Sequence, residues 1–170
     1  MHNEFSILYQ KYKNPIFSYL YYLAGDKSVA EEICQDVFLK VYLNIAKFEG
    51  RSSFKTWIYK IAKNTYLDYV RSQKKDTVLE NLDYFSNNLV DKSMGPEEHA
   101  VNLAMKEQIE KTLTKMSEKY RMLLILRDIQ NLSYKEISEI TDMELNTVKV
   151  GIFRARREFR KIYQEMEDEF

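Results

Sequence analysis

Residues 133–161 constrain the fold more than any other stretch, because they contain two helix signatures separated by a short break. Ser133 and Glu136 form a Ser-x-x-Glu capping box, in which each side chain can satisfy a free backbone amide at a helix start. Residues 141–144 favour local hydrogen bonds that compete with a helix, and Asn146 is a suitable N-cap for a second helix. Two short helices at this spacing predict a helix-turn-helix.

The second of these helices is strongly basic. Residues 145–162 contain six Lys or Arg and a single acid, Glu158. The apolar residues recur at steps of four, three and four and predict one inward stripe, made of Val148, Ile152, Ala155 and Phe159. A basic face on a terminal helix can simply be solvated, but the capped helix directly before it favours DNA binding.

In a helix-turn-helix, the start of the second helix contacts base edges and later cations contact phosphates. We therefore predict base contacts from Asn146, Thr147, Lys149 and Val150. Phosphate contacts are predicted mainly from Arg154, Arg157 and Arg160, and Phe153 belongs to the same outward surface.

The rest of the chain predicts an all-α protein of two small helical domains joined by a flexible linker. Only 4 glycines and 2 prolines occur in 170 residues, which argues against a turn-rich β fold. The spacing of apolar residues predicts helices over residues 3–23, 28–48, 54–75, 97–116 and 117–130. Pro15 is expected to kink or divide the first helix. The expected N-caps are Ser28, with Glu31 as its capping-box partner, Ser53 and Ser117.

One face of the helix predicted at residues 54–75 mixes basic, amide and aromatic groups. The side expected to be buried carries Phe54, Trp57, Ile58, Ile61, Ala62 and Thr65. The opposite, exposed side carries Lys55, Tyr59, Lys60, Lys63, Asn64, Asp68, Arg71, Lys74 and Lys75. Such a mixture suits single-stranded nucleic acid, because cations follow the backbone and rings stack on unpaired bases. The residues alone leave open a plain amphipathic helix.

Charge is unevenly distributed, although the total is zero. Residues 1–75 hold 12 basic and 7 acidic side chains, residues 76–98 hold 1 and 6, and the remainder hold 13 and 13. Residues 76–96 lose helical periodicity and end in Gly-Pro, so we predict a tether between domains at residues 1–75 and 97–170. The apolar residues of this tether favour docking on a partner: Leu79, Leu82, Tyr84, Phe85 and Leu89.

Several classes of function find no support in the sequence. No run approaches the ~18 apolar residues of a membrane helix, and the start lacks a secretory segment, so we expect a cytoplasmic protein without membrane insertion. Cys34 has no partner for an internal disulfide and is expected to be a buried thiol, and His2 and His99 lack the spacing of metal ligands. Without a phosphate loop, dinucleotide turn or nucleophile elbow, we expect neither enzymatic activity nor a cofactor.

Three stretches carry a resemblance to a known family. They read AEEICQDVFLKVY at residues 30–42, FKTWIYKIAKNTYLDYVR at 54–71 and NTVKVGIFRARREF at 146–159. In this order they resemble the extracytoplasmic-function (ECF) class of bacterial sigma factors, in the sigma-70 family, and the resemblance covers nearly the whole chain. It implies a subunit that directs RNA polymerase to promoters, with a region 2 domain at residues 1–75 and a region 4 domain at residues 97–170.

The resemblance also implies a role for each stretch. The helix at residues 28–48 would bind the clamp helices of core RNA polymerase through Gln35, Asp36 and Leu39. The next helix would read and melt the −10 element, and residues 47–53 would capture a flipped base. The −10 contacts implied are Tyr59, Lys60, Lys63, Asn64, Asp68 and Arg71. The helix-turn-helix would read the −35 element, the tether would pass near the RNA exit path, and an anti-sigma protein would be the regulator.

The chain departs from this family at one place. Many members carry Ser or Thr followed by Arg where this chain has Val150 and Gly151. Val150 offers a contact to a thymine methyl group but no hydrogen bond. Gly151 costs about 1 kcal/mol relative to alanine within a helix and leaves open a close approach of DNA to the backbone.

Two other functions are compatible with parts of the pattern. A stand-alone helix-turn-helix transcription regulator would bind duplex DNA without polymerase. A protein that only binds other proteins would leave the one-sided cations of residues 145–162 unexplained.

Overall fold

The computed structural model describes residues 2–76 and 96–169, and this part of the chain is helical with no strand. The helices are α1 (His2–Ala24), α2 (Lys27–Asn44), α3 (Phe54–Asp76), α4 (Pro96–Lys115), α5 (Glu118–Leu124), α6 (Tyr134–Thr141) and α7 (Leu145–Asp168). A 3₁₀ turn, η1 (Ile45–Lys47), follows α2, and a π-helical segment, η2 (Ile125–Ile129), continues α5. The expected all-α fold of two helical domains is confirmed, while the tether lies almost wholly outside the described residues.

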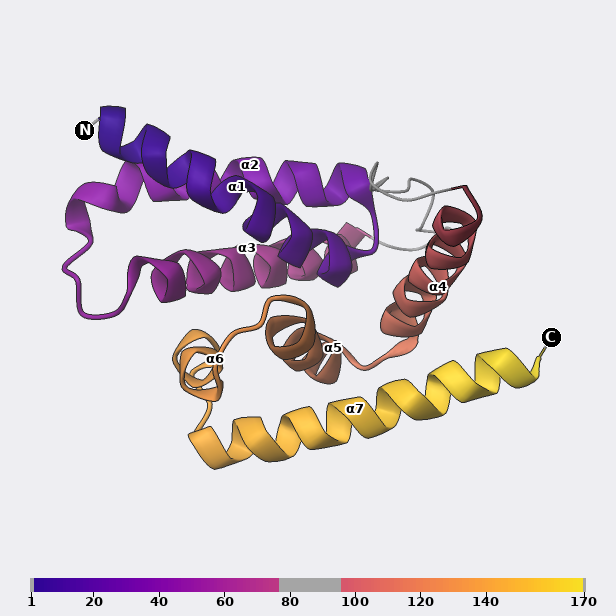
Figure 1. Cartoon of the computed structure of the whole chain (residues 1–170). Helices are drawn as coiled ribbons and strands as arrows, with labels where there is room; N and C mark the ends of the chain where they lie inside the picture. Colours follow the sequence, from indigo (N-terminus) through magenta and orange to yellow (C-terminus); the bar gives the residue numbers. More distant parts are fainter. Residues whose placement is uncertain (1, 77–95, 170) are drawn as a thin grey trace.

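The first domain consists of α1, α2 and α3 (Figure 1). Helix α1 continues through Pro15 without being divided, and it ends where Gly25 takes a positive φ of 72°. The cap of α2 is Asp26 and not Ser28, because Asp26 has an extended backbone and its carboxylate accepts a hydrogen bond from the Val29 amide at 2.9 Å. Ser28 already lies in the first turn, so its predicted capping role is wrong.

The connection between α2 and α3 is held by aromatic packing. Phe48, Phe54 and Trp57 form a triangle of rings whose centroids are 5.1 to 5.7 Å apart. Ser53 accepts a hydrogen bond from the Thr56 amide at 3.1 Å, which confirms its predicted role as the cap of α3. These contacts therefore fix the direction in which α3 leaves the loop and packs against α1 and α2.

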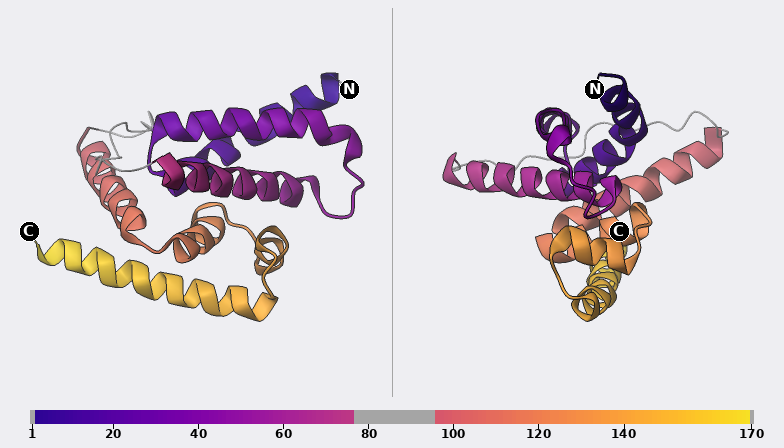
Figure 2. Two further views of the ribbon diagram at one scale, coloured as in Figure 1. Left: turned by 180° about the vertical axis from the view of Figure 1, so that it is seen from behind. Right: turned by 90° about the vertical axis from the view of Figure 1, so that its left-hand side faces the viewer.

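The second domain consists of α4 to α7. Four consecutive residues of α5 and η2 are buried, namely Leu123, Leu124, Ile125 and Leu126, as their uninterrupted hydrophobicity predicted. Ser117 precedes α5 as its N-cap residue but makes no capping bond with its side chain. Helix α7 runs along the outer side of this domain, as both views of Figure 2 show.

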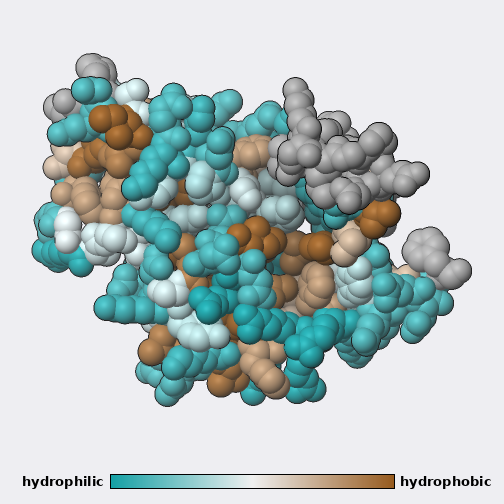
Figure 3. Space-filling view, viewed as in Figure 1, coloured by the Kyte–Doolittle hydropathy of each residue, from teal (hydrophilic) through white to brown (hydrophobic). Residues whose placement is uncertain are grey.

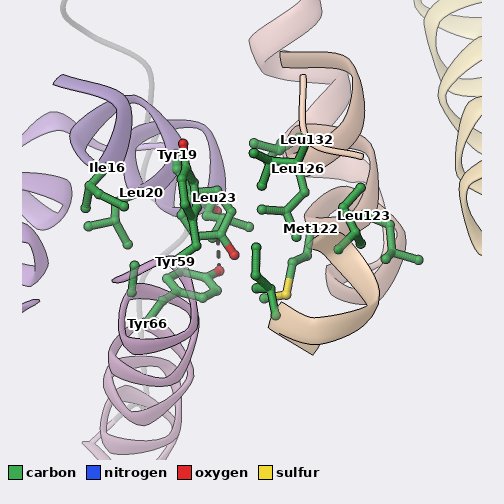
Figure 4. Packing of buried hydrophobic residues seen from close by; sticks show 14 of the residues in the cluster. Ile16, Tyr19, Leu20, Leu23, Tyr59, Tyr66, Met122, Leu123, Leu126 and Leu132 are labelled. Carbon is green, nitrogen blue, oxygen red and sulfur yellow. Dashed lines mark hydrogen bonds between the residues drawn. The ribbon is translucent and has the colours of Figure 1, made fainter. Parts of the chain in front are cut away.

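The two domains pack directly against each other. Figure 4 shows Tyr19 and Leu23 of α1 and Tyr59 of α3 facing Met122 and Leu126 of the second domain. All five side chains are at most 8% exposed. One apolar cluster therefore runs through both domains, and α3 lies against α6.

Candidate nucleic-acid interface

The helix-turn-helix is built as the sequence predicts at its start. The Ser133 hydroxyl accepts a hydrogen bond from the Glu136 amide at 3.1 Å, and the Glu136 carboxylate accepts one from the Ser133 amide at 3.2 Å. Helix α6 then ends at Thr141, and the left-handed φ of 57° at its C-cap residue, Asp142, turns the chain. These local contacts fix the angle at which α7 leaves the turn.

The cap of α7 differs from the prediction. Helix α7 begins at Leu145, its N-cap residue is Glu144, and no side chain caps it. Asn146 is already the second residue of the helix, so its predicted capping role is wrong. Its amide is exposed near the start of α7, where a base contact is expected.

Helix α7 presents the predicted outward surface. Val148, Ile152 and Ala155 are at most 1% exposed and Phe159 is half-buried, which confirms the inward stripe. All eight residues predicted to contact the −35 element are exposed: Asn146, Thr147, Lys149, Val150, Phe153, Arg154, Arg157 and Arg160. We call these eight residues the α7 surface. Among them Val150 is 48% and Phe153 61% exposed, so this surface presents apolar side chains beside its cations.

Arg156 is a cation of α7 with a different task. Its guanidinium donates two hydrogen bonds to the Asp128 carboxylate, at 2.9 and 2.6 Å. This bidentate pair raises the pKa of Arg156 above its usual range. Arg156 therefore fastens α7 to η2.

Gly151 faces the protein core and not the outward side of α7. A Cβ atom at this position would lie 2.6 Å from Cδ1 of Leu123, which is closer than carbon atoms approach. Packing against α5 therefore accounts for the glycine, and an approach of DNA to its backbone stays a prediction. The glycine lets α5 and α7 pack closely.

The single acid of the basic helix also has a structural partner. The Glu158 carboxylate accepts hydrogen bonds from the Ser117 amide at 2.7 Å and from the Ser117 hydroxyl at 3.3 Å. Ser117 does not cap α5 with its own side chain, because its hydroxyl is turned toward Glu158. This contact ties the start of α5 to the middle of α7.

The outward side of α3 is only partly as predicted. Asn64, Asp68 and Arg71 are exposed, and the last two form an ion pair at 3.3 Å. Tyr59 and Lys63, which were expected to be exposed, are only 3% and 9% exposed. That part of the prediction is wrong, because the second domain covers this side of α3.

Polar contacts accompany this burial. The Tyr59 hydroxyl donates a hydrogen bond to the Gln130 side-chain oxygen at 2.6 Å, and burial raises the pKa of Tyr59. Burial lowers the pKa of Lys63; the attraction of Asp142 opposes this shift, and repulsion by the neighbouring Lys60 adds a smaller lowering. Neither side chain is free to contact a nucleic acid in this arrangement.

Two ion pairs join α3 to the helix-turn-helix. Lys60 lies 2.8 Å from Asp142 and Lys55 lies 3.1 Å from Glu136. The hydrogen bond from Lys60 lowers the pKa of Asp142. Burial raises the pKa of Glu136, but hydrogen bonds from Ser133 and Lys55 outweigh this effect and lower it overall.

A hollow beside α3 adds two residues of α2, Lys40 and Asn44, to those that the sequence singled out. It measures about 370 Å³ and lies between α2 and α3, lined by Lys40, Asn44, Lys47, Trp57, Ile61, Asn64 and Thr65. The Lys40 ammonium donates a hydrogen bond to the Thr65 hydroxyl at 3.1 Å. Lys40 and Asn44 are four residues apart and so lie on one side of α2. This spacing could have predicted, from the sequence, a polar side of α2 facing α3.

The predicted polymerase-binding residues lie on the free side of α2. Gln35, Asp36 and Leu39 are all exposed. Leu39 is 57% exposed, and Leu43, one turn later, is 63% exposed. Figure 3 shows apolar side chains gathered on the surface at the N-terminal end of α1. Leu43 was missed from sequence, although its spacing of four from Leu39 places both on one side of α2.

The other polar groups named from the sequence suggest no chemistry. Cys34 is half-buried, and burial raises the pKa of its thiol to about 11. Within residues 2–76 and 96–169, no three His, Cys, Asp or Glu side chains are placed to hold a metal. No helix in those same ranges has the length and hydrophobicity needed to cross a membrane.

Comparison with known proteins agrees with both halves of the chain. Residues 8–76 match the family model for sigma-70 region 2, and residues 106–159 match that for sigma-70 region 4. The ECF RNA polymerase sigma factor SigW of Bacillus subtilis is 33% identical over 171 residues, covering 96% of this chain and 91% of SigW. The chain belongs to the ECF sigma factors. The family expected from the three sequence stretches is thereby confirmed.

Other ECF sigma factors give the same result. SigM of Bacillus subtilis is 30% identical over 92% of this chain and 93% of its own length. The sigma-E factor of Escherichia coli K12 is 30% identical over 89% of this chain and 82% of its own length. This ECF sigma factor is therefore related to these proteins along nearly its full length.

Solved structures agree on the fold. The sigma factor RpoE of Bartonella quintana, in complex with the anti-sigma factor NepR, superimposes with a TM-score of 0.76 at 18% identity, covering 95% of this chain and 97% of RpoE. CnrH, in complex with the cytosolic domain of CnrY, gives a TM-score of 0.73 at 16% identity, covering 97% and 90%. At these identities the likeness concerns the fold of this ECF sigma factor.

Proposed function

We propose that this ECF sigma factor binds core RNA polymerase and directs it to promoters. The second domain reads the duplex −35 element, and the first domain reads and melts the −10 element. The observation that carries this proposal is the exposed α7 surface, which stands at the end of a capped helix-turn-helix in a chain related to ECF sigma factors along nearly its full length.

The −35 element is read by the α7 surface. Asn146, Thr147, Lys149 and Val150 lie near the start of α7, which enters the major groove in a helix-turn-helix. Arg154, Arg157 and Arg160 follow along the helix and donate to phosphates. Each phosphate contact adds about 0.9 to the slope of log affinity against log salt, so binding should weaken steeply as salt rises.

The −10 element is read by α3 after the two domains separate. Asn64, Asp68 and Arg71 are accessible, whereas Tyr59, Lys60 and Lys63 are covered by the second domain or paired with it. Opening exposes these groups, and the hollow lined by Lys40, Trp57 and Asn64 then lies beside them. Cations and an aromatic ring at one place suit an unpaired strand.

Core polymerase binds the free side of α2 through Gln35, Asp36 and Leu39. This side lies away from α1 and α3, so it is accessible in the closed arrangement as well. Binding there, followed by separation of the domains, would place the two DNA readers at the spacing of a promoter.

A regulatory partner and a location follow from the same proposal. Since RpoE and CnrH were each solved with a bound partner, we propose that an anti-sigma protein regulates this chain in the cytoplasm. Purification from native cells should recover polymerase and a second, non-polymerase protein. Recovery of polymerase alone would count against a dedicated regulator.

A mobility-shift experiment tests the main proposal. The purified chain is mixed with promoter fragments, with and without core polymerase, and R154A/R157A serves as the variant with two phosphate contacts removed. A shift that requires core polymerase, and that is weakened in the double variant, supports the proposal. Equal binding of duplex DNA without core polymerase would indicate a stand-alone regulator, and failure to co-elute with core polymerase in gel filtration would refute polymerase binding.

A further inference from the structure

A groove lies between the start of α5 and the start of α7. Lys119 and Tyr120 form its α5 wall, and Asn146, Thr147, Val150, Gly151 and Arg154 form its α7 wall. It measures about 320 Å³. Four of the eight residues of the α7 surface therefore share a groove with two residues of α5 that the sequence did not single out.

Two contacts fix α5 against α7 at this place. The Glu158 carboxylate accepts hydrogen bonds from the backbone amide and the hydroxyl of Ser117, which lies two residues before Lys119. On the other side, the Leu123 side chain packs directly against Gly151, in space that a Cβ atom at residue 151 would occupy. The α5 wall is thus a rigid extension of the α7 surface.

The charge of the groove is entirely positive. Among the residues that line it, the ionisable side chains at neutral pH are Lys119 and Arg154, and both are exposed. The neighbouring Glu118 is not among the residues that line the groove. Hydroxyl, amide and ammonium groups around a cationic groove are the donors that DNA phosphates accept from.

We propose that the −35 reading surface continues from α7 onto α5. Lys119 donates a hydrogen bond to a backbone phosphate of the DNA strand that borders the major groove occupied by α7. Tyr120 lines the same groove and adds an apolar wall to it. This inference rests on the proposed function, because it takes α7 to be the −35 reader. Lys119 positions the duplex without reading sequence, since phosphates carry no base information.

The test uses the full chain assembled with core polymerase, bound to a duplex promoter at a series of salt concentrations. K119A should weaken promoter affinity by roughly three- to tenfold and lower the salt slope by about 1. K119R should restore both quantities, because it keeps the positive charge. V150S should instead change the preferred −35 sequence and leave the salt slope unchanged.

K111A is the matched control. Lys111 is also an exposed lysine of the second domain, but it pairs with Glu107 at 2.7 Å on α4 and lies beside Met166 at the far end of α7. If K119A and K111A have the same affinity and the same salt slope, Lys119 makes no phosphate contact and the inference is wrong. If the wild-type holoenzyme does not bind the promoter at all, the proposed function fails together with the inference.

Discussion

At the scale of single residues, Gly151 shows a constraint that the sequence alone does not carry. Its position in a basic helix suggested only the usual helical penalty of about 1 kcal/mol or a close approach of DNA. In the folded protein it meets Leu123, from another helix, and any side chain at residue 151 would occupy the same space. Leu123 is 1% exposed, so its surroundings limit how far it can move.

Replacing Gly151 with alanine should therefore have opposite effects in two backgrounds. In the wild type, G151A should lower the free energy of unfolding by about 1 kcal/mol, because overpacking of about 1–3 kcal/mol exceeds the gain in helix propensity. In an L123A background, the added methyl group fills space and G151A should stabilise by about 1 kcal/mol. Urea unfolding of the four proteins measures this cycle, and additive effects would show that the two positions do not touch.

Helix caps, which depend on residues near in sequence, were predicted only in part. The capping box of Ser133 and Glu136 and the cap at Ser53 each involve residues three apart, and both occur as expected. The caps assigned to Ser28 and Asn146 were each wrong by two positions, since the N-cap residues are Asp26 and Glu144. The residue at which a helix starts depends on the backbone angles of the preceding residues. Residue type favours certain angles but does not determine them.

At the scale of elements, each helix was predicted, but not what covers its outward side. The periodicity of α3 identified Ile58, Ala62 and Thr65 as buried, and they are. It could not show that Tyr59 and Lys63 are buried. The elements that cover them belong to the second domain, which is separated from α3 in the sequence by residues 77–95 and helix α4. Helical spacing shows which residues share a side and not which second domain packs there.

The contact of α4 with α1 contains a buried acid and should depend on pH. Glu110 is 3% exposed and interacts with Tyr21 of α1. Burial raises the pKa of Glu110 from its reference value of 4.5, and the attraction of Lys106 and the hydrogen bond with Tyr21 only partly oppose this. Because the folded state then binds the proton more tightly than the unfolded state, protonation of Glu110 favours folding as pH falls.

The stability of E110Q relative to the wild type should reveal this linkage. Gln has no proton to gain, so the difference in unfolding free energy should shift in favour of the wild type as pH falls from 7 to 4.5, and level off below. Each unit of raised pKa contributes about 1.4 kcal/mol. E139Q, which removes an exposed acid of α6, is the control. A difference that stays constant with pH, or shifts the other way, would contradict a raised pKa.

At the scale of the whole molecule, the two domains form a closed arrangement that hides part of its own −10 reader. Apolar packing of Leu23 against Met122 and Leu126 is joined by the ion pairs of Lys55 and Lys60 with the helix-turn-helix. Exposed ion pairs each contribute about 0–1 kcal/mol of stability. They therefore help to orient the two domains but add little to the free energy that holds them together. Most of the cost of opening therefore lies in the apolar packing, and binding to core polymerase and promoter DNA has to offset it.

Charge reversal should shift the closed arrangement in a predictable way. K55E/K60E places acids opposite Glu136 and Asp142, and we expect a larger radius of gyration by small-angle X-ray scattering at low salt. Adding E136K/D142K reverses all four charges and should restore the compact form. If the doubly reversed protein stays as extended as K55E/K60E, or if the wild type is already as extended, the domains are not held as the structure has them.

The central claim is that this ECF sigma factor gives core RNA polymerase its choice of promoter. Run-off transcription on genomic fragments, followed by mapping of start sites, tests it most directly. With the wild-type chain, core polymerase should produce discrete transcripts whose starts share upstream −35 and −10 sequences, and R154A/R157A should reduce them at least tenfold if two phosphate contacts are lost. Transcripts that are the same with and without the chain would contradict the account.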